Sequence, residues 1–461
     1  MGNCMVTQTA TVEGLNGEVQ EVQLRMPMSM VLAVGMINLC DAVEDAVANR
    51  PRLSDVISYK DERYNLAFGK ETGISNRCKN KMSSIKGNSR WVKEFSCMSS
   101  DDADLFSDLS WELLGRYMSN NTHLKEVWLN FLMNDSRMRP LFRGLTKSTS
   151  IEKLFLYNSR NENGEQFGPD AIRDMVPFLK NATKLLCISL TGNPIHTEGF
   201  EVLVNALDGG QIDSLLLDGC SIDDISSLVG CTLPNMTSLG LSGNNITSIP
   251  SLKNHPSLKS LDLSRNKVDK PLLLENNKSL RHLSLDSNGI TDDDVEVFVD
   301  LLQHKTTLEH LDLSDNPFTE RGLCALLRLL NDVSSIGSTL KSNHTLTYID
   351  CPNSGRDFAF PRAEPNSADD TPTQKELRML IKDATRINDE SSNPGRDKVI
   401  QTQLNSTKRY ELARILGTSD SLFSDDDTFL LPEVLALVGE EHGHNELYQL
   451  LIEVVPYLMS Q

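Results

Sequence analysis

Hydrophobic and polar positions follow the same pattern in four stretches of the chain between residues 236 and 318. The stretches read MTSLGLSGNNI, LKSLDLSRNKV, LRHLSLDSNGI and LEHLDLSDNPF, and they begin at Met236, Leu258, Leu280 and Leu308. All four fit L-x-x-L-x-L-x-x-N-x-φ, where φ is apolar and Met236 replaces the first leucine. Because the same positions recur in one register, the chain contains an internal structural repeat.

The pattern predicts a short β-strand in each repeat. Successive side chains of a strand point to opposite sides, so the two leucines of an L-x-L, such as Leu239 and Leu241, lie on one side. A single strand cannot bury that side, but stacked repeats can. The repeated asparagine is expected where the chain leaves the strand, with its amide bonded to the backbone of a neighbouring turn. The asparagines are Asn244, Asn266, Asn288 and Asn316.

A looser form of the pattern extends to both sides of this region. Further strands are expected to begin at Leu124, Ile151, Leu185, Ile212 and Leu346. Repeats of 27 or 28 residues leave room for a helix, and residues 199–207 and 293–304 have helical spacing of apolar side chains. Repeats of 22 to 24 residues leave room only for a 3₁₀ or extended segment. DLSWELLGRYMS predicts a helix before the first strand, with Leu109, Leu113 and Tyr117 on one face.

The chain resembles ribonuclease-inhibitor-type leucine-rich repeats over residues 105–352. Two segments carry the resemblance, and they read TGNPIHTEGFEVLVNAL and DSNGITDDDVEVFVDLLQHKTTLEHLDLSDNPFTERGLCALLRLL. WELLGRYMSNNTHLKEVWL and the C-terminal RDKVIQTQL are similar to uncharacterised intracellular leucine-rich-repeat proteins of unicellular algae. The resemblance implies an α/β solenoid, a horseshoe with a parallel concave sheet and with convex helices or 3₁₀ segments. It also implies protein binding on the concave face. The 22-residue repeats depart from the inhibitor family, so ribonuclease binding is not implied.

Four regions are expected along the chain. They are an N-terminal flanking region at 1–100, the solenoid at 101–355, a linker rich in Pro, Ser and Asp at 356–373, and a C-terminal helical unit at 374–461 that covers the open end of the solenoid. Within the first region, Gln8 to Leu24 predicts a hairpin and residues 27–49 predict a helix. The last region predicts helices near 374–388, 396–416, 429–440 and 445–459.

One basic stretch stands out in the N-terminal flanking region, at residues 77–93. Its cations are Arg77, Lys79, Lys81, Lys86, Arg90 and Lys93, and it includes Trp91. We expect a solvated, mobile loop there. The alternative is a contact with phosphate, anionic lipid or an acidic partner.

Composition limits the partners and the compartment. The 461 residues carry a net charge of −19 at pH 7, which argues against nucleic-acid binding and favours a basic or neutral protein partner. Nine cysteines without a CxxC pair indicate thiols in a reducing compartment, so a cytoplasmic location is expected. No stretch reaches transmembrane length, and the apolar run at 28–40 lacks the marks of a signal peptide. Acylation at Gly2 or Cys4 is not favoured, because Val6 stands where the motif needs Ser or Thr.

The residues between the core leucines are expected to face the concave side. Aromatic side chains stand on the first strands, and aspartates, histidines and a tyrosine stand on the last four. Exposed aromatics are frequent interface hot spots, and an acidic stripe favours a basic partner. The alternative is that the flanking region covers the aromatics and that the aspartates are merely solvated. We therefore expect a non-enzymatic protein-interaction scaffold whose contact residues are Trp128, Phe155, Tyr157, Asp262, His282, Asp286, His310, Asp312, Tyr348 and Asp350.

Two other kinds of site fit parts of the sequence. His282 and His310 are expected on adjacent strands, roughly 5 Å apart, where Asp286 or Asp312 could complete a zinc site; the run Glu440–His444 is a weaker metal candidate. Arg160 lies in a long loop after a strand, a placement similar to the catalytic arginine of Ran-type GTPase activators, although the surrounding residues do not match that motif. No motif of a self-sufficient enzyme is present, and no cofactor is expected.

Overall fold

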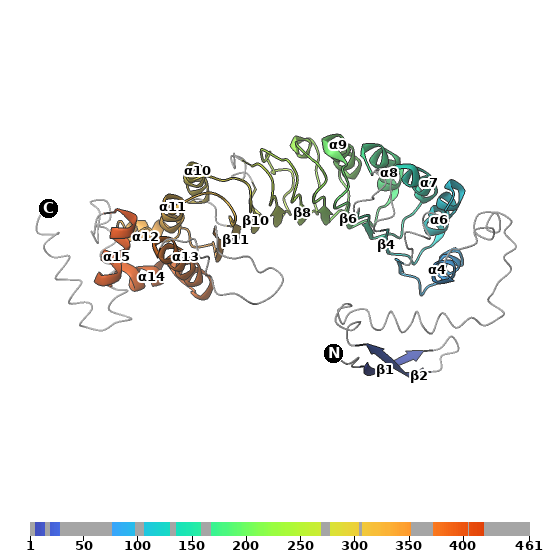
Figure 1. Ribbon diagram of the computed structural model, residues 1–461, viewed down its shortest axis with the longest axis horizontal. Helices are drawn as coiled ribbons and strands as arrows, with labels where there is room; N and C mark the ends of the chain where they lie inside the picture. Colours follow the sequence, from blue (N-terminus) through green and yellow to red (C-terminus); the bar gives the residue numbers. More distant parts are fainter. Residues whose placement is uncertain are drawn as a thin grey trace, which may run out of the picture. The chain divides into compact units, whose positions relative to one another are not determined.

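The chain comprises two compact units. Unit 1 contains Met1–Glu165 and Asp174–Leu185, and unit 2 contains Gln166–Arg173 and Leu186–Gln461. The computed structural model (Figure 1) describes residues 5–13, 19–27, 76–96, 106–129, 135–157, 167–268, 277–303, 307–351, 372–403 and 405–418.

Unit 1 alternates helices with short parallel strands. The strands pair in chain order, β3 with β4 and β4 with β5. The hairpin expected between Gln8 and Leu24 is confirmed as an antiparallel pair, β1 with β2. The elements of the unit are β1 (Met5–Glu13), β2 (Val19–Pro27), α4 (Asn76–Lys86), β3 (Glu94–Phe95), α6 (Asp108–Asn120), β4 (Glu126–Trp128), α7 (Asp135–Leu145) and β5 (Lys153–Phe155). Helix α8 (Pro169–Asn181) follows β5.

The basic stretch is not a solvated loop, so this prediction was wrong for residues 76–86. Helix α4 occupies them, and it buries Cys78, Met82 and Ile85 at helical spacing. Val92 and Phe95 are buried as well, and β3 pairs with β4 in the same way as every later strand. A repeat-like helix and strand therefore precede the first expected strand. The lysines obscured this pattern because they alternate with the buried side chains of a short amphipathic helix, on which Lys79, Lys81 and Lys86 are half-buried.

Helix α6 agrees with its prediction except at one position. Leu113 and Tyr117 are buried as expected, but Leu109 is exposed. Trp111 is buried instead and contacts Phe106, with 5.1 Å between ring centroids. The buried face of the helix is therefore centred nearer Trp111 than the leucine spacing suggested.

Unit 2 contains the four regular repeats. Its strands are parallel and follow the chain order from β6 to β12. Helices α9, α10 and α11 lie on one side of these strands, and the opposite side is called the strand face below (Figure 1). The strands are β6 (Cys187–Ser189), β7 (Ser214–Leu216), β8 (Ser238–Gly240), β9 (Ser260–Asp262), β10 (His282–Ser284), β11 (His310–Asp312) and β12 (Tyr348–Asp350).

The nine expected strands and the helices expected at 199–207 and 293–304 are confirmed. Apart from Pro27, the helix expected at 27–49 lies outside the described residues, as do those expected at 429–440 and 445–459. Each of the nine strands begins two residues after its expected first residue, because the leading apolar side chain enters the core from the turn before the strand. Long repeats carry helices, and one short repeat carries a 3₁₀ segment, as their lengths predicted. These elements are α9 (His196–Leu207), η1 (Ser226–Val229), α10 (Asp292–Gln303), α11 (Glu320–Leu330) and α12 (Ile336–Lys341).

The repeated asparagines join successive turns. The Nδ2 group of Asn244 donates to the carbonyl oxygens of Leu217 (2.9 Å) and Leu241 (2.8 Å). Its Oδ1 atom accepts from the backbone N–H groups of Cys220 and Ile222. The other three asparagines are also buried and donate to backbone carbonyls of their own repeat and the preceding one. Each amide therefore supplies backbone partners that the irregular turns lack.

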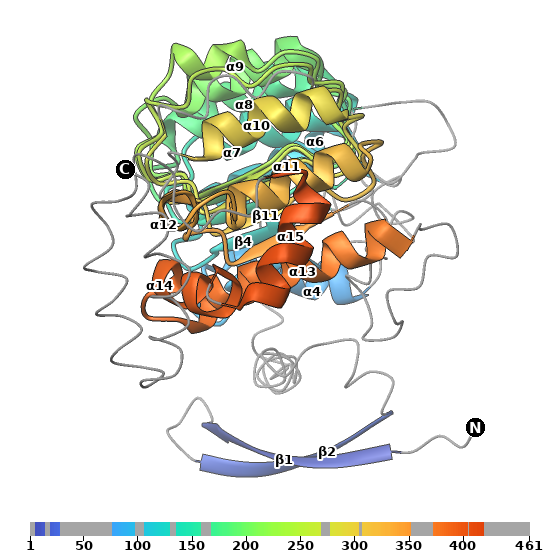
Figure 2. The ribbon, with the colours of Figure 1, turned by 90° about the vertical axis from the view of Figure 1, so that its left-hand side faces the viewer.

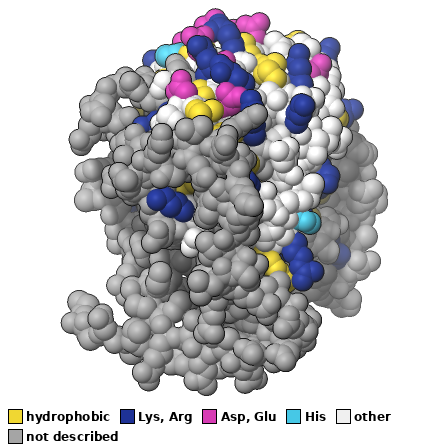
Figure 3. Space-filling view, turned by 90° about the vertical axis from the view of Figure 1, so that its right-hand side faces the viewer, with side chains coloured by type: hydrophobic (Ala, Val, Ile, Leu, Met, Phe, Trp, Pro, Cys, Tyr) yellow, Lys and Arg dark blue, Asp and Glu magenta, His cyan; other side chains and the backbone are white. Residues whose placement is uncertain are grey.

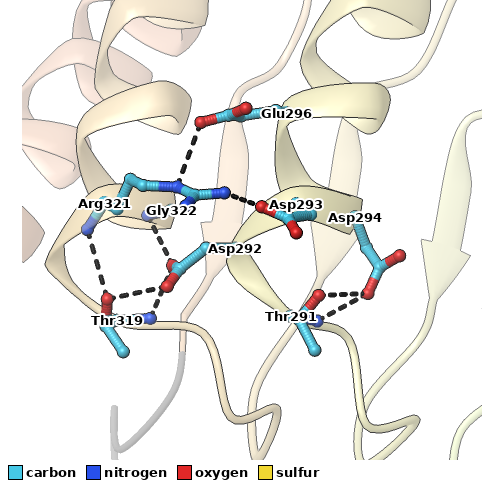
Figure 4. A network of polar contacts seen from close by, with 8 residues as sticks. All are labelled: Thr291, Asp292, Asp293, Asp294, Glu296, Thr319, Arg321 and Gly322. Atoms are coloured by element: carbon cyan, nitrogen blue, oxygen red, sulfur yellow. Dashed lines mark hydrogen bonds and ion pairs between the residues drawn. The ribbon is translucent and has the colours of Figure 1, made fainter.

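A polar network joins the N-terminal ends of α10 and α11 (Figure 4). The Asp292 carboxylate accepts from the backbone N–H groups of Thr319 and Gly322, both at 2.8 Å, and from the Thr319 hydroxyl. Arg321 at the start of α11 pairs with Asp293 and Glu296 of α10. The first turn of one helix thus caps the next, as an N-cap carboxylate does within a single helix.

We expect Asp292→Ala to lower the free energy of unfolding by about 1 kcal/mol at neutral pH, as for the loss of an N-cap. Burial acts to raise the pKa of Asp292, but the hydrogen bonds from Thr319 and Gly322 outweigh it, so the pKa lies below its usual value. This contribution is complete above the unfolded pKa of about 3.9 and is lost as the pH falls through the folded pKa.

Urea denaturation measured across this pH range should show the difference between wild type and Asp292→Ala narrowing below a pH of about 4. Asp300→Ala, an exposed carboxylate on the same helix, is the control. Equal stability of wild type and Asp292→Ala at neutral pH would contradict the capping role.

The C-terminal helices pack against the last repeats (Figure 2). Helix α13 (Pro372–Glu390) contacts α11 and β12, and its Asn388 Nδ2 donates to the Leu346 carbonyl at 2.7 Å. The prediction of a single helix at 396–416 was wrong. The chain forms α14 (Pro394–Lys398), a π-helical turn at Val399–Gln403 and α15 (Ser406–Leu416). The reason is a new N-cap, in which the Asn405 side chain accepts from the Lys408 N–H at 3.1 Å.

Lys398 anchors α14 to the last repeats. Its side chain is fully buried, and Nζ lies 2.5 Å from the Leu330 carbonyl oxygen and 3.1 Å from both the Asn343 carbonyl oxygen and His344 Nδ1. Burial lowers the pKa of Lys398 to about 7. The unfolded chain therefore holds this proton up to a higher pH than the folded chain does.

Lys398 should therefore make the free energy of unfolding increase with pH between about 7 and about 10.4, the pKa of a lysine in the unfolded chain. The expected slope is at most about 1.4 kcal/mol per pH unit. Lys398→Met should lose this slope, whereas the exposed control Lys408→Met should keep it. Chemical denaturation at several pH values measures both profiles, and parallel profiles for wild type and Lys398→Met would contradict the prediction.

Candidate functional site

Aromatic rings gather on the strands of unit 1, and we call Trp128, Phe155 and Tyr157 the aromatic face. Trp128 stacks on Phe155 of the next strand, with 3.8 Å between ring centroids and 19° between planes. The centroids of Phe155 and Tyr157 are 6.0 Å apart. Phe155 is only 8% exposed, so, contrary to expectation, it supports the other two rings rather than offering a contact surface of its own. Trp128 and Tyr157 are half-buried.

Charged groups beside the aromatic face are paired. Trp128 Nε1 donates to Glu126 at 3.3 Å, and Glu126 also pairs with Lys153 of the next strand at 2.8 Å. The same alternation of strand residues places all these side chains on one side. The aromatic face therefore presents ring edges and faces beside a neutralised ion pair.

A second row of rings crosses the last strands of unit 2, and we call His282, His310 and Tyr348 the ring ladder. His282 pairs in register with His310, and His310 with Tyr348. Ring centroids are 4.6 Å apart between the histidines and 5.7 Å apart between His310 and Tyr348, with planes tilted by 32° and 31°. All three side chains are exposed, Tyr348 at 48%.

Carboxylates form a neighbouring row, which we call the acidic row, at the last residue of β9, β11 and β12, and Ser284 takes this position on β10. Its members are Asp262, Asp312 and Asp350, all half-buried. Asp312 lies directly beside Asp350 in the strand register. It accepts hydrogen bonds from the Ser314 N–H at 2.9 Å and the Ser284 hydroxyl at 3.3 Å. The serines thus hold the Asp312 carboxylate in one orientation.

Asp286 does not belong to this surface, so its expected place as a contact residue was wrong. Its exposed fraction is 0%, and it accepts from the hydroxyl groups of Ser287 (3.0 Å) and Ser314 (3.5 Å). The second residue after β10 turns toward the interior, as do the equivalent residues Ser264 after β9 and Ser314 after β11, which are also buried. The alternation of a strand no longer holds once the chain has entered the turn.

The surroundings of His310 and Tyr348 favour their uncharged forms near pH 7. Burial and the neighbouring His282 lower the pKa of His310, while Glu309 and Asp389 act in the opposite direction. Burial, Asp350 and Asp312 raise the pKa of Tyr348. Neither of these two rings therefore opposes the negative charge of the acidic row at neutral pH.

Helix α13 contributes charges that the sequence did not suggest. Asp389 acts on His310, and Arg378 interacts electrostatically with Asp350. Both residues lie in the helix that contacts β12. No local pattern in the sequence links them to the strand face, since the contact depends on how the C-terminal helix packs.

The other candidate sites have no support among the described residues. In the described ranges, no group of three or more His, Cys, Asp or Glu side chains could hold a metal ion, so the zinc hypothesis for His282 and His310 is not supported. Arg160 and Glu440–His444 lie outside the described residues. Within the described ranges, every helix is too short or too polar to cross a lipid bilayer.

The cations of the basic stretch differ in exposure: Lys79, Lys81 and Lys86 are half-buried, whereas Arg90 and Lys93 are exposed. Figure 3 views the side of the molecule on which α4 and α6 lie, and its lysine and arginine side chains are dispersed among acidic and uncharged ones. Lys86 of this stretch is placed over the ring of Tyr117, 5.6 Å from its centroid. A contact of these residues with phosphate, lipid or an acidic partner stays a prediction.

Leucine-rich repeats are recognised in unit 2. One family model of two leucine-rich repeats matches residues 234–275, and a second leucine-rich-repeat model matches 276–299 and 304–327. With the stacked parallel strands, these matches establish a leucine-rich-repeat solenoid fold. No protein of curated function matches the chain. The ribonuclease-inhibitor subtype and the resemblance to algal proteins stay predictions.

Two solved structures of internalins from Listeria monocytogenes str. 4b F2365 are similar to this chain. Internalin inlF is 21% identical, with a TM-score of 0.35, over 52% of this chain and 71% of its own. Internalin C2 is 20% identical, with a TM-score of 0.32, over 56% of this chain and 89% of its own. Likeness at this level says nothing about function.

Proposed function

We propose that the protein is a non-enzymatic interaction module that binds a protein partner on its strand faces. The observation that carries the proposal is the exposed ring ladder of unit 2 beside the acidic row. Exposed rings of this kind are typical of interface hot spots. Strand alternation directs them away from the buried leucines Leu283 and Leu311. The Trp128 and Tyr157 rings of unit 1 offer a second contact surface.

The partner is expected to be basic at its contact with unit 2. The acidic row is negative at neutral pH, and the chain as a whole carries a net charge of −19. Complementary charge speeds association and rejects acidic partners. Nucleic acid is therefore a poor ligand for this face.

A reducing, cytoplasmic compartment is part of the proposal. Cys220, Cys231, Cys324 and Cys351 are free thiols, and Cys220, Cys231 and Cys351 are buried. Burial raises the pKa of Cys220 and of Cys351 to about 12, which keeps both thiols protonated and unreactive.

The test is capture of partners from a lysate of the source cells with two face variants, Trp128→Ala/Tyr157→Ala and Tyr348→Ala/Asp312→Asn. The matched control is Trp91→Ala/Tyr410→Ala, which removes the same ring types from exposed positions away from the strand faces. We expect at least one face variant to weaken a specific partner by 10-fold or more, about 1.4 kcal/mol. Partners that bind both face variants and the wild type equally would overturn the proposal.

A further inference from the structure

The ring ladder and the acidic row lie side by side on β11 and β12. On each of these two strands the ring and the carboxylate are two positions apart, which is about 7 Å along a strand. A chain crossing β11 and β12 therefore meets rings on one side and carboxylates on the other. A ligand that fits must combine a flat, polarisable group with a positive charge that can reach across this distance.

We infer that this surface is a receptor for an arginine side chain of the bound partner. The inference rests on the proposed function and specifies the chemistry of its partner. A guanidinium group is planar and stacks on aromatic faces, and its N–H groups can donate to a carboxylate as a fork. Here it would lie on the rings of His310 and Tyr348 and donate to Asp312.

Asp312 is the carboxylate assigned to the partner. Its neighbour Asp350 already interacts electrostatically with Arg378 of α13, so part of that charge is balanced within the chain. Asp312 accepts from Ser284 and Ser314 only through uncharged donors, and a carboxylate has room for more donors than these. Its negative charge therefore stays available to a cation.

Neighbouring charges do not compete with an incoming guanidinium. Arg281 beside His282 is paired with Glu309 of the next repeat. The low pKa of His310 keeps its ring uncharged at neutral pH, so the ring does not repel a cation. Asp389 of α13 adds further negative potential near His310.

Lysine fits this surface less well. Its ammonium group is a compact, strongly hydrated charge that cannot stack on a ring or donate as a planar fork. It would still be attracted to Asp312, so both cations should bind, but only arginine should gain from the rings. The part of the arginine-to-lysine ratio that is lost when the rings are removed therefore reports ring stacking separately from charge.

The experiment measures fluorescence anisotropy of labelled Gly/Ser peptides that carry two arginines, two lysines or two citrullines, with the full-length protein at pH 7.5. The variants are His310→Leu/Tyr348→Leu, which replaces the rings by apolar side chains, and Asp312→Asn. The matched control is His123→Leu/Tyr410→Leu, which changes the same residue types at exposed positions elsewhere.

Wild type and control should bind the arginine peptide at least 10-fold more tightly than the lysine peptide and should not bind the citrulline peptide measurably. The ring variant should reduce the arginine-to-lysine ratio several-fold, and Asp312→Asn should weaken both peptides at least 10-fold. Equal affinity for arginine and lysine in the wild type, an arginine-to-lysine ratio unchanged in the ring variant, or no binding of the arginine peptide would each overturn the inference. If Tyr348→Ala/Asp312→Asn still loses its captured partner in that case, the proposed function stands and only the arginine assignment falls.

Discussion

Gly144→Ala is expected to destabilise unit 1 by about 3 kcal/mol, the upper part of the usual range for overpacking. A Cβ atom on Gly144 would lie 2.2 Å from the carbonyl oxygen of Glu112 and 2.7 Å from the backbone nitrogen of Arg116. Both are backbone atoms of α6, so no side chain can move aside to make room. The helices α6 and α7 would have to separate, and a close-packed interior has no space to absorb that movement.

The contact is mutual, which offers a second test. A Cβ atom on Gly115 of α6 would lie 2.1 Å from the Leu141 carbonyl oxygen of α7, so Gly115→Ala should be about as damaging. Gly87→Ala is the control, since its Cβ atom would come no closer than 3.4 Å to the Ser83 oxygen.

Tryptophan fluorescence can follow this experiment selectively. The three tryptophans of the chain, Trp91, Trp111 and Trp128, all belong to unit 1. Urea denaturation monitored at this signal should show a clearly lower urea midpoint for Gly144→Ala and Gly115→Ala. The free energy of unfolding of the control should change by less than about 0.5 kcal/mol. Midpoints unchanged from wild type would mean that α6 and α7 do not pack this closely.

Asn316→Ala is expected to destabilise unit 2 by about 4 kcal/mol. Its Nδ2 group donates to the carbonyl oxygens of Leu285 (3.0 Å) and Leu313 (2.9 Å), and its Oδ1 atom accepts from the N–H groups of Asn288 (2.9 Å) and Ile290 (3.0 Å). The side chain is buried, so alanine would leave four backbone groups short of a partner. Each such group costs about 1–3 kcal/mol, and local rearrangement recovers part of the total.

Far-UV circular dichroism during urea denaturation measures this effect over the whole chain. Asn245→Ala, an exposed asparagine within a repeat, should change stability by less than about 0.5 kcal/mol. Asn316→Asp should also be damaging, since a carboxylate cannot donate to Leu285 and Leu313. A loss for Asn316→Ala no greater than for Asn245→Ala would contradict the role of the asparagines in joining the repeats.

The arrangement of the candidate site was partly predictable. Strand alternation places Trp128, His282, His310 and Tyr348 on one side of their strands, and the in-register stacking of repeats makes His282 and His310 neighbours. That stacking follows from the repeat itself, because each strand must meet the equivalent strand of the next repeat. The order of the ring ladder could therefore be read from the spacing of the leucines.

The exposure of individual site residues was not predictable in the same way. Phe155 is covered by its aromatic neighbours, and Asp286 turns inward where the chain leaves the strand. Arg378 acts on the acidic row, and Asp389 acts on His310 of the ring ladder, only because α13 packs against β12. These features depend on contacts between segments that are distant in sequence, and no local pattern records them.

The sequence by itself determined the repeat, its nine expected strands and its asparagines, because each follows from a local spacing that recurs with the period of the repeat. Tertiary structure alone decided the rest. It made a helix and strand of the basic stretch before the first expected repeat, divided the C-terminal helix at Asn405, and brought Gly115 and Gly144 into backbone contact. The physical reason is that the repeat pattern specifies how each strand stacks on its own copy, whereas the ends of the solenoid and the helix contacts have no copy to match. Their structure is determined by packing against whatever surface the repeats leave exposed.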